Sequence, residues 1–117
     1  MHEASLAGGV LQLVEDAQRR EGFARVLELH LEAGQLAGVD ARALRFALEC
    51  LAPGTVLDGA TLRIDEPAGQ AWCMPCGLMV EIGQRGQACP HCGGYQLQAT
   101  GGLELRVVDL RVSDECE

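Results

Sequence analysis

The chain has 117 residues, 48% of them hydrophobic, and a formal net charge of −8, with nine basic residues that are all arginine. This length can bury one modest core plus a small metal-stabilised module. The acidic balance and the few aromatic residues argue against nucleic-acid binding. The start, Met1-His2-Glu3, is not basic and no apolar run approaches about 20 residues, so we expect a cytoplasmic protein with no signal peptide and no membrane span.

The first predicted elements are a helix and a strand. Apolar residues recur at helical spacing from Leu6 to Ala17, and Gly22, which follows two arginines, predicts the end of this helix. Between Leu27 and Ala33, apolar residues alternate with glutamate or histidine. This alternation predicts a strand over 25–33 with one buried face.

A second helix and two more strands are predicted further along. Asp40 is a suitable N-cap for a helix over 41–52, which ends before a Pro-Gly pair. Residues at about 60–66 indicate a strand that stops at a proline. Residues 103–112 indicate a longer strand that could return to the first sheet.

Four of the six cysteines form two pairs, Cys73-Met-Pro-Cys76 and Cys89-Pro-His-Cys92, separated by twelve residues. Two residues between cysteines let the chain turn back, so that both sulfurs reach one ion at about 2.3 Å. The glycine after each pair keeps the turn free of a Cβ clash. In a reducing compartment such pairs are typical of metal ligands. We therefore predict one structural Zn(II) site, closed by four thiolates.

Iron is the chemical alternative to zinc at this site. Four thiolates also suit a single iron ion, which would make the chain an electron carrier of the rubredoxin type. His91, within the second cysteine pair, is interpreted as a spacer that could replace a cysteine if the zinc shell rearranged. Colour separates the two metals, because ferric iron held by four thiolates is red and zinc is colourless.

These patterns predict an α+β fold with two helices packed on a small three-stranded sheet and an inserted four-cysteine zinc-ribbon module. The expected domains are residues 1–69 plus 101–117, and residues 70–100 for the inserted module. The sequence contains no nucleophile with an adjacent base and no phosphate-binding loop. We therefore expect a protein that is not an enzyme.

A second candidate metal site lies at the N-terminus. The α-amine of Met1, the amide nitrogens of His2 and Glu3, and the His2 imidazole can surround one ion in fused chelate rings. Four nitrogens in a plane suit Ni(II) or Cu(II). A histidine at position 2 is also typical of a frayed, solvated terminus.

Three further side chains are candidate site residues. Cys50 has no partner at ligand spacing and is expected to pack as a small hydrophobe near the end of the second helix. Cys116, in the acidic tail, is expected to be an exposed thiol. His30 lies on the polar face of the first strand, where a solvated position and a role in a metal or partner surface are both compatible with the sequence.

The combination of these features resembles the HypA/HybF hydrogenase nickel-incorporation proteins over the whole chain. The features are Met1-His2-Glu3 followed by Ser5-Leu6, the alternating helices and strands, the two cysteine pairs, and a closing Gly-Gly-Leu-Glu-Leu strand. The resemblance implies a metallochaperone that takes up Ni(II) transiently and hands it to the precursor of the [NiFe]-hydrogenase large subunit. It also implies a HypB-type GTPase as a partner.

Carried over residue by residue, the family's nickel ligand falls on His2, with Glu3 supplying an amide nitrogen. The structural zinc ligands of the family fall on Cys73, Cys76, Cys89 and Cys92. Some members carry histidines directly after the cysteine pairs, where this chain has glycines, so the resemblance implies no ligand switching at zinc. A zinc-ribbon interaction module without nickel function is the main alternative, and it leaves Met1-His2-Glu3 without a role.

Overall fold

The computed structural model of the chain describes residues 2–115. The backbone divides into two compact units. Unit 1 consists of Met1–Leu31, Asp40–Ile64 and Val107–Glu117, and unit 2 of Glu32–Val39 and Asp65–Arg106. In chain order the elements are α1 (Glu3–Glu21), β1 (Arg25–Ala33), α2 (Ala41–Leu51), β2 (Thr61–Asp65), β3 (Gly69–Cys73), β4 (Leu78–Ile82), β5 (Leu97–Gly101) and β6 (Leu105–Ser113).

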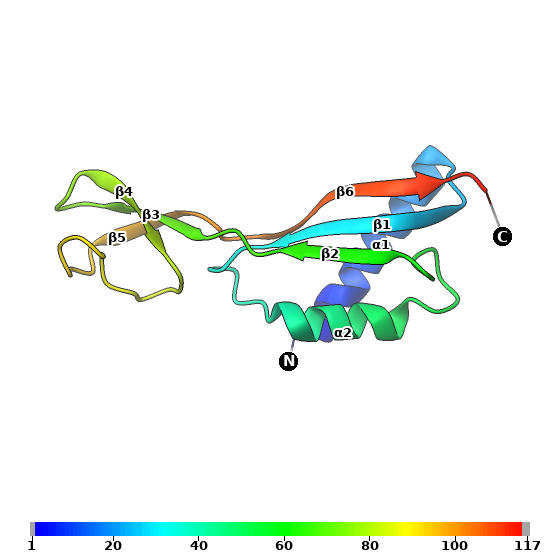
Figure 1. Ribbon diagram of the computed structural model, residues 1–117, viewed down its shortest axis with the longest axis horizontal. Helices are drawn as coiled ribbons and strands as arrows, with labels where there is room; N and C mark the ends of the chain where they lie inside the picture. The colour runs from blue at the N-terminus through cyan, green and yellow to red at the C-terminus, as the bar shows by residue number, and fades with distance from the viewer. Residues whose placement is uncertain (1, 116–117) are drawn as a thin grey trace. The chain divides into compact units, whose positions relative to one another are not determined.

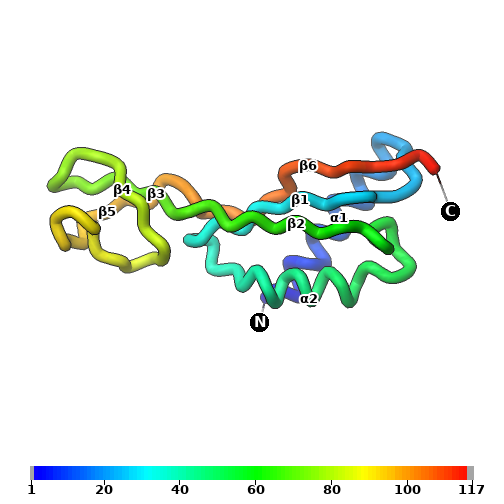
Figure 2. The backbone as a smooth tube through the Cα atoms, viewed as in Figure 1, coloured from blue at the N-terminus to red at the C-terminus, as the bar shows by residue number. Residues whose placement is uncertain are grey.

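Unit 1 is a three-stranded sheet, in the order β2-β1-β6, with both helices on one face (Figure 1). The backbone trace in Figure 2 follows β6 along one side of β1 and β2 along the other. The predicted α+β fold, with two helices packed on a three-stranded sheet, is therefore confirmed. Among the described residues, no helix combines the length and apolar character needed to cross a membrane.

The core of unit 1 is built from aliphatic side chains of both helices and the central strand. Every second residue near the end of β1 faces the helices, as the alternation predicts. The N-cap of α2 is Asp40, whose side chain accepts the backbone N–H groups of Arg42 and Ala43 at 3.0 and 3.2 Å. The buried aliphatic residues are Ala7, Val10, Val14, Val26, Leu29, Leu31, Leu44, Leu48 and Leu57.

Helix α1 is capped at its C-terminal end by Gly22, as predicted, and it begins at Glu3, before the first apolar residue of the pattern, Leu6. His2 is the N-cap, and its carbonyl accepts the N–H of Leu6 at 2.9 Å. The Glu3 carboxylate lies in the first turn, where the helix dipole favours a negative charge. It also accepts the backbone N–H of Asp40 at 3.1 Å. This bond links the start of α1 to the start of α2, a contact between distant residues that apolar spacing does not reveal.

Unit 2 contains a second three-stranded sheet, in the order β4-β3-β5, with antiparallel pairing on both sides of β3. The predicted zinc-ribbon module is thus a small three-stranded sheet, and the sequence pattern did not indicate its individual strands. One face of this sheet is buried. Its core consists of Leu36, Ala71, Cys73, Val80, Ile82 and Cys89.

The backbone segments of unit 2 meet at a pair of glycines. Gly34 donates its N–H to the carbonyl of Glu104 at 3.0 Å, and Leu36 donates to the carbonyl of Gly102 at 2.8 Å. A Cβ at position 34 would overlap the backbone carbonyl of Gly102. Only glycine permits this close approach of two backbones.

We expect Gly34→Ala to destabilise the protein by about 1–3 kcal/mol, because the added methyl group forces the two backbones apart. Thermal unfolding followed by circular dichroism measures this loss. Gly8→Ala is the matched control, since a Cβ at position 8 of α1 meets nothing within 4 Å. That control should gain up to about 1 kcal/mol. Equal stability of the two variants would contradict the close approach.

Candidate metal centre

The four cysteines of the two pairs converge in unit 2. Cys73 is the last residue of β3, Cys76 follows in the turn before β4, and Cys89 and Cys92 lie in the connection between β4 and β5. The four sulfurs all lie within 4.8 Å of one another. The sulfurs of Cys73 and Cys92 are 3.7 Å apart, and those of Cys76 and Cys89 are 4.0 Å apart. Ligands about 2.3 Å from a central zinc form a tetrahedron with edges of about 3.8 Å, so the spacing fits that ion.

Each cysteine pair closes its turn with the same backbone bond. Gly77 donates its N–H to the carbonyl of Cys73, and Gly93 donates to that of Cys89, both at 2.9 Å. The φ angles of the two glycines are 65° and 74°. A Cβ at either position would meet nothing within 4 Å, so the requirement for glycine comes from positive φ and not from lack of space.

The surrounding groups affect the four thiols differently. The backbone N–H of Cys92, followed by that of His91, lowers the pKa of Cys89 to about 6, although burial raises it. The neighbouring thiols of Cys73 and then Cys92 raise the pKa of Cys76 to about 12. The N–H of Cys76 lowers the pKa of Cys73, but burial and the thiols around it give a net rise. Four sulfurs this close become thiolates together only around a cation.

The N-terminal candidate residues lie at the start of α1. The His2 side chain is 57% exposed, and its Nδ1 is 3.8 Å from a carboxylate oxygen of Glu3. Glu3 is buried, although the sequence assigned it only an amide nitrogen as a functional group. The role of its carboxylate at Asp40 is a feature that sequence reasoning missed. An acidic residue directly before an amphipathic helix is the one local signal for it. Met1 and Cys116 lie outside the described residues.

The remaining candidate residues are separate from the cysteine cluster. Cys50 is exposed, so the prediction that it packs as a small hydrophobe is wrong. The reason is that it lies on α2 opposite the face that Leu44 and Leu48 bury. The side chain of His30 is 12% exposed, with its Nδ1 3.6 Å from a carboxylate oxygen of Asp109 on β6. His30 is therefore held on the sheet and not extended into solvent.

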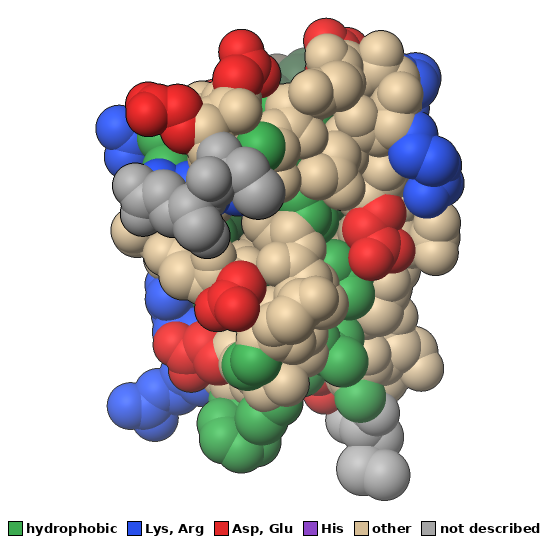
Figure 3. All heavy atoms as spheres, turned by 90° about the vertical axis from the view of Figure 1, so that its right-hand side faces the viewer, with side chains coloured by type: hydrophobic (Ala, Val, Ile, Leu, Met, Phe, Trp, Pro, Cys, Tyr) green, Lys and Arg blue, Asp and Glu red, His purple; other side chains and the backbone are tan. Residues whose placement is uncertain are grey.

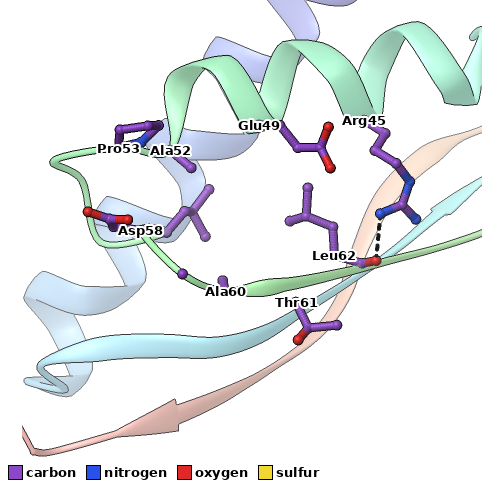
Figure 4. A pocket seen from close by; sticks show the side chains of 10 residues that line it. Arg45, Glu49, Ala52, Pro53, Asp58, Ala60, Thr61 and Leu62 are labelled. Carbon is purple, nitrogen blue, oxygen red and sulfur yellow. Dashed lines mark hydrogen bonds between the residues drawn. The ribbon is translucent and has the colours of Figure 1, made fainter.

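A hollow of about 400 Å³ lies between α2 and the start of β2 (Figure 4). Arg45 donates to the carbonyl of Leu62 at 2.9 Å along one wall, and Glu49 lies beside it on α2. Asp58 lines the other end, where its carboxylate accepts the backbone N–H of Gly54 at 3.1 Å. None of the predicted ligands lines it. Among residues 2–115 the four cysteines are the one group of three or more potential metal ligands that lie together.

Comparison with known proteins places this geometry in a family. The family model described as "Hydrogenase/urease nickel incorporation, metallochaperone, hypA" matches residues 1–112. A hydrogenase maturation factor HypA from Polaromonas naphthalenivorans (strain CJ2) is 68% identical over 115 residues, which cover 98% of this chain and 100% of the relative. The same factor from Cupriavidus necator is 62% identical over 114 residues, covering 97% of this chain and 96% of the relative.

A solved structure shares the fold. The solution structure of the Ni metallochaperone HypA from Helicobacter pylori superposes with a TM-score of 0.69 at 20% sequence identity. The alignment covers 98% of this chain and 100% of that one. The family match and the close relatives together extend over nearly the whole sequence, including His2 and all four clustered cysteines. The chain therefore belongs to the HypA family of hydrogenase/urease nickel-incorporation metallochaperones.

Proposed function

We propose that this protein binds Ni(II) at its N-terminus through His2 and delivers it to the precursor of the [NiFe]-hydrogenase large subunit in the cytoplasm. The observation that carries the proposal is the exposed His2 side chain at the N-cap of α1, in a chain that matches the family model from its first residue. In this proposal, unit 1 carries transient nickel and unit 2 carries structural zinc.

The backbone at the start of α1 supports nitrogen ligation. The first N–H groups of an α-helix have no carbonyl one turn earlier to bind. Nickel can therefore replace the amide protons of His2 and Glu3 without breaking a bond inside the helix. The amine of Met1 completes the proposed plane of four nitrogens with the His2 imidazole, an arrangement that suits Ni(II).

Exposure of the site suits a protein that must give up its ion. A metal held in a plane at a chain end is open above and below, so the ligands of a recipient can attack it before the donor ligands leave. Imidazole, amine and amide nitrogens bind metal in their deprotonated forms, and protons therefore compete with nickel. Tetrahedral thiolates, in contrast, form a closed shell.

We propose that Zn(II) binds to Cys73, Cys76, Cys89 and Cys92 and acts structurally. The sulfur separations fit this ion, and the four ligands leave no open coordination position. When bound, zinc neutralises the thiolates and joins the two cysteine turns. Cys73 and Cys89 are also part of the small core of unit 2, so metal binding and packing stabilise the same sheet.

A HypB-type GTPase is the proposed partner in nickel transfer. The net charge of −8 favours association with a basic protein surface. Acidic and arginine side chains are interspersed on the face drawn in Figure 3, so this attraction acts through the overall charge and not through one acidic patch on that face.

Replacing His2 tests the nickel site. In calorimetric titrations of zinc-loaded, tag-free protein, His2→Ala should lower nickel affinity at least about 100-fold, or about 2.8 kcal/mol. His91→Ala, which removes an exposed histidine in unit 2, should bind nickel like the unmodified chain. Acidification from about pH 8 to about pH 6 should also weaken binding steeply, because protons compete for the nitrogen ligands.

A version extended by a few residues before Met1 reports whether the terminal amine is a ligand. Equal nickel binding by the unmodified, His2→Ala and extended chains would overturn the nickel proposal. The same result would favour the alternative function, a zinc-ribbon interaction module without a nickel role.

Removing one thiolate tests the zinc site. Cys73→Ser should lose bound zinc in native mass spectrometry and should lose hydrogen-exchange protection in β3–β5, because the metal joins the two turns of unit 2. Cys50→Ser changes an exposed cysteine outside the cluster and should keep its zinc. Full zinc occupancy in Cys73→Ser would contradict the assigned ligand set.

Salt tests the electrostatic part of the partner proposal. The association rate with the GTPase should fall several-fold between about 50 and 300 mM salt, because screening weakens attraction between opposite charges. Stopped-flow fluorescence or surface plasmon resonance measures this rate. An association rate that does not change with salt would exclude electrostatic attraction, without bearing on the nickel site.

A further inference from the structure

Unit 2 leaves large apolar side chains on its surface, although its own core is small. The buried large aliphatic residues of this core are Leu36, Val80 and Ile82. The large apolar residues of the unit that remain exposed are Trp72, Met74, Leu78, Met79 and Tyr95. Apolar side chains gathered on the surface of so small a unit are typical of a contact with another protein.

Trp72 lies in the middle of the open face of the β4-β3-β5 sheet. Successive side chains of a strand point to opposite faces, and Ala71 and Cys73, the neighbours of Trp72 on β3, belong to the core. Strand β3 runs between β4 and β5 (Figure 1), and the register places Met79 and Gln98 opposite Trp72 on its two sides. With 38% of its surface exposed, Trp72 offers its indole ring to a ligand above the sheet.

Hydrogen-bond acceptors lie around the indole ring on the same face. Glu81 of β4 pairs with Gln70 of β3, one step along the sheet from the pair of Trp72 and Met79. Diagonal neighbours of this kind have Cβ atoms about 7–8 Å apart, so one planar group can contact both the indole ring and the carboxylate. The amides of Gln70 and Gln98 add two further acceptors. We refer to Gln70, Trp72, Met79, Glu81 and Gln98 as the tryptophan face.

The tryptophan face has a negative charge and no cation of its own. Unit 2 has two arginines, and both bind elsewhere. Arg106 pairs with Glu32 at 2.9 Å, and Arg85 donates to the carbonyl of Leu36, a residue of the core on the opposite side of the sheet, at 3.0 Å. Within the part of the chain that the structure describes, the exposed Glu81 side chain has no ion-pair partner.

We propose that the tryptophan face binds an arginine in an extended segment of a protein partner. The guanidinium plane stacks on the indole ring of Trp72 and donates to the carboxylate of Glu81. A guanidinium ion satisfies both groups at once because it is planar, charged and carries several N–H donors. A lysine ammonium has the same charge but cannot stack as a plane.

The side chains beside Trp72 explain why the occupant is a protein segment. Met79 adds a flexible thioether that adapts to apolar side chains next to the arginine. The glutamines accept N–H groups of a backbone that lies across the sheet. This contact goes beyond the proposed nickel role, because none of the proposed nickel ligands belongs to the tryptophan face.

The test uses Trp72 as its own reporter. It is the one tryptophan of the chain, so its indole N–H gives an isolated signal in proton–nitrogen NMR spectra. The probe is the peptide Val-Thr-Arg-Thr-Val, blocked at both ends, added to the zinc-loaded, nickel-free full chain. The signal should shift with a dissociation constant of about 1 mM or tighter, since a single stacked arginine contributes about twofold to thirtyfold in affinity.

Two altered peptides separate charge from shape. Citrulline in place of the arginine keeps the planar shape and removes the charge, whereas lysine keeps the charge and removes the plane. Both peptides should bind at least about threefold more weakly than the arginine peptide. Equal binding of the three peptides would overturn the proposal and indicate a purely apolar contact. The absence of any shift up to about 5 mM peptide would overturn it as well.

Variants of the chain locate the contact. Glu81→Gln should weaken binding of the arginine peptide about threefold, because it removes the charge and keeps the size of the side chain. Glu104→Gln is the matched control, since it changes an exposed glutamate of unit 2 outside the tryptophan face and should bind as the unmodified chain does. Native mass spectrometry confirms that both variants keep zinc. Equal weakening by the two variants would show a general charge effect and overturn the assigned site.

Replacing the tryptophan tests the stacking contact. In Trp72→Leu, followed through the backbone amide signals of β3–β5, the preference for the arginine peptide over the lysine peptide should disappear, because leucine has no aromatic ring. A preserved preference would overturn the role of Trp72. These outcomes are independent of nickel binding at His2.

Discussion

The stability of unit 2 depends on four sulfur atoms that lie within 4.8 Å of one another. Neighbouring thiols raise the pKa of Cys76 to about 12, so the sulfurs oppose one another's ionisation. The buried core of the unit has only six residues, and two of them are cysteines of the cluster. A small core that includes its own ligands gains stability from a cation and loses it when the cation is absent. The short strands and the glycine turns of this sheet hold the four sulfurs close together beside its buried face.

At the start of α1 the candidate metal-binding side chain is exposed and not enclosed in a core. Its backbone is held by the bond between Glu3 and Asp40, while the neighbouring His2 side chain remains exposed. A fixed backbone with an exposed imidazole presents nitrogen atoms in a reproducible direction, as the proposed nickel site requires, without enclosing an ion. The two candidate metal sites therefore differ in access, one closed within a core and the other open at a helix start. This difference in access is what the proposed roles require, a resident ion in the closed site and a transferred ion in the open one.

The sequence predicted the elements whose signals are local. Alternation in β1, the Asp40 cap and the Gly22 stop each depend on neighbouring residues, and the structure has each where it was expected. The spacing of the cysteines likewise predicted that they would meet. The strands of unit 2 were missed because each has only five residues and their burial depends on the sheet as a whole. The burial of Glu3 and the exposure of Cys50 depend on how α1 and α2 pack, which periodicity alone does not specify.

Leu36 shows why the sheet of unit 2 is not an independent module in the chain. It is fully enclosed in the core with the cysteines, and its carbonyl accepts a bond from Arg85 at 3.0 Å. It comes from a segment more than thirty residues before the first of those cysteines. A contiguous fragment around the two cysteine pairs would open this core, so the metal-binding sheet cannot be grafted by copying that stretch alone.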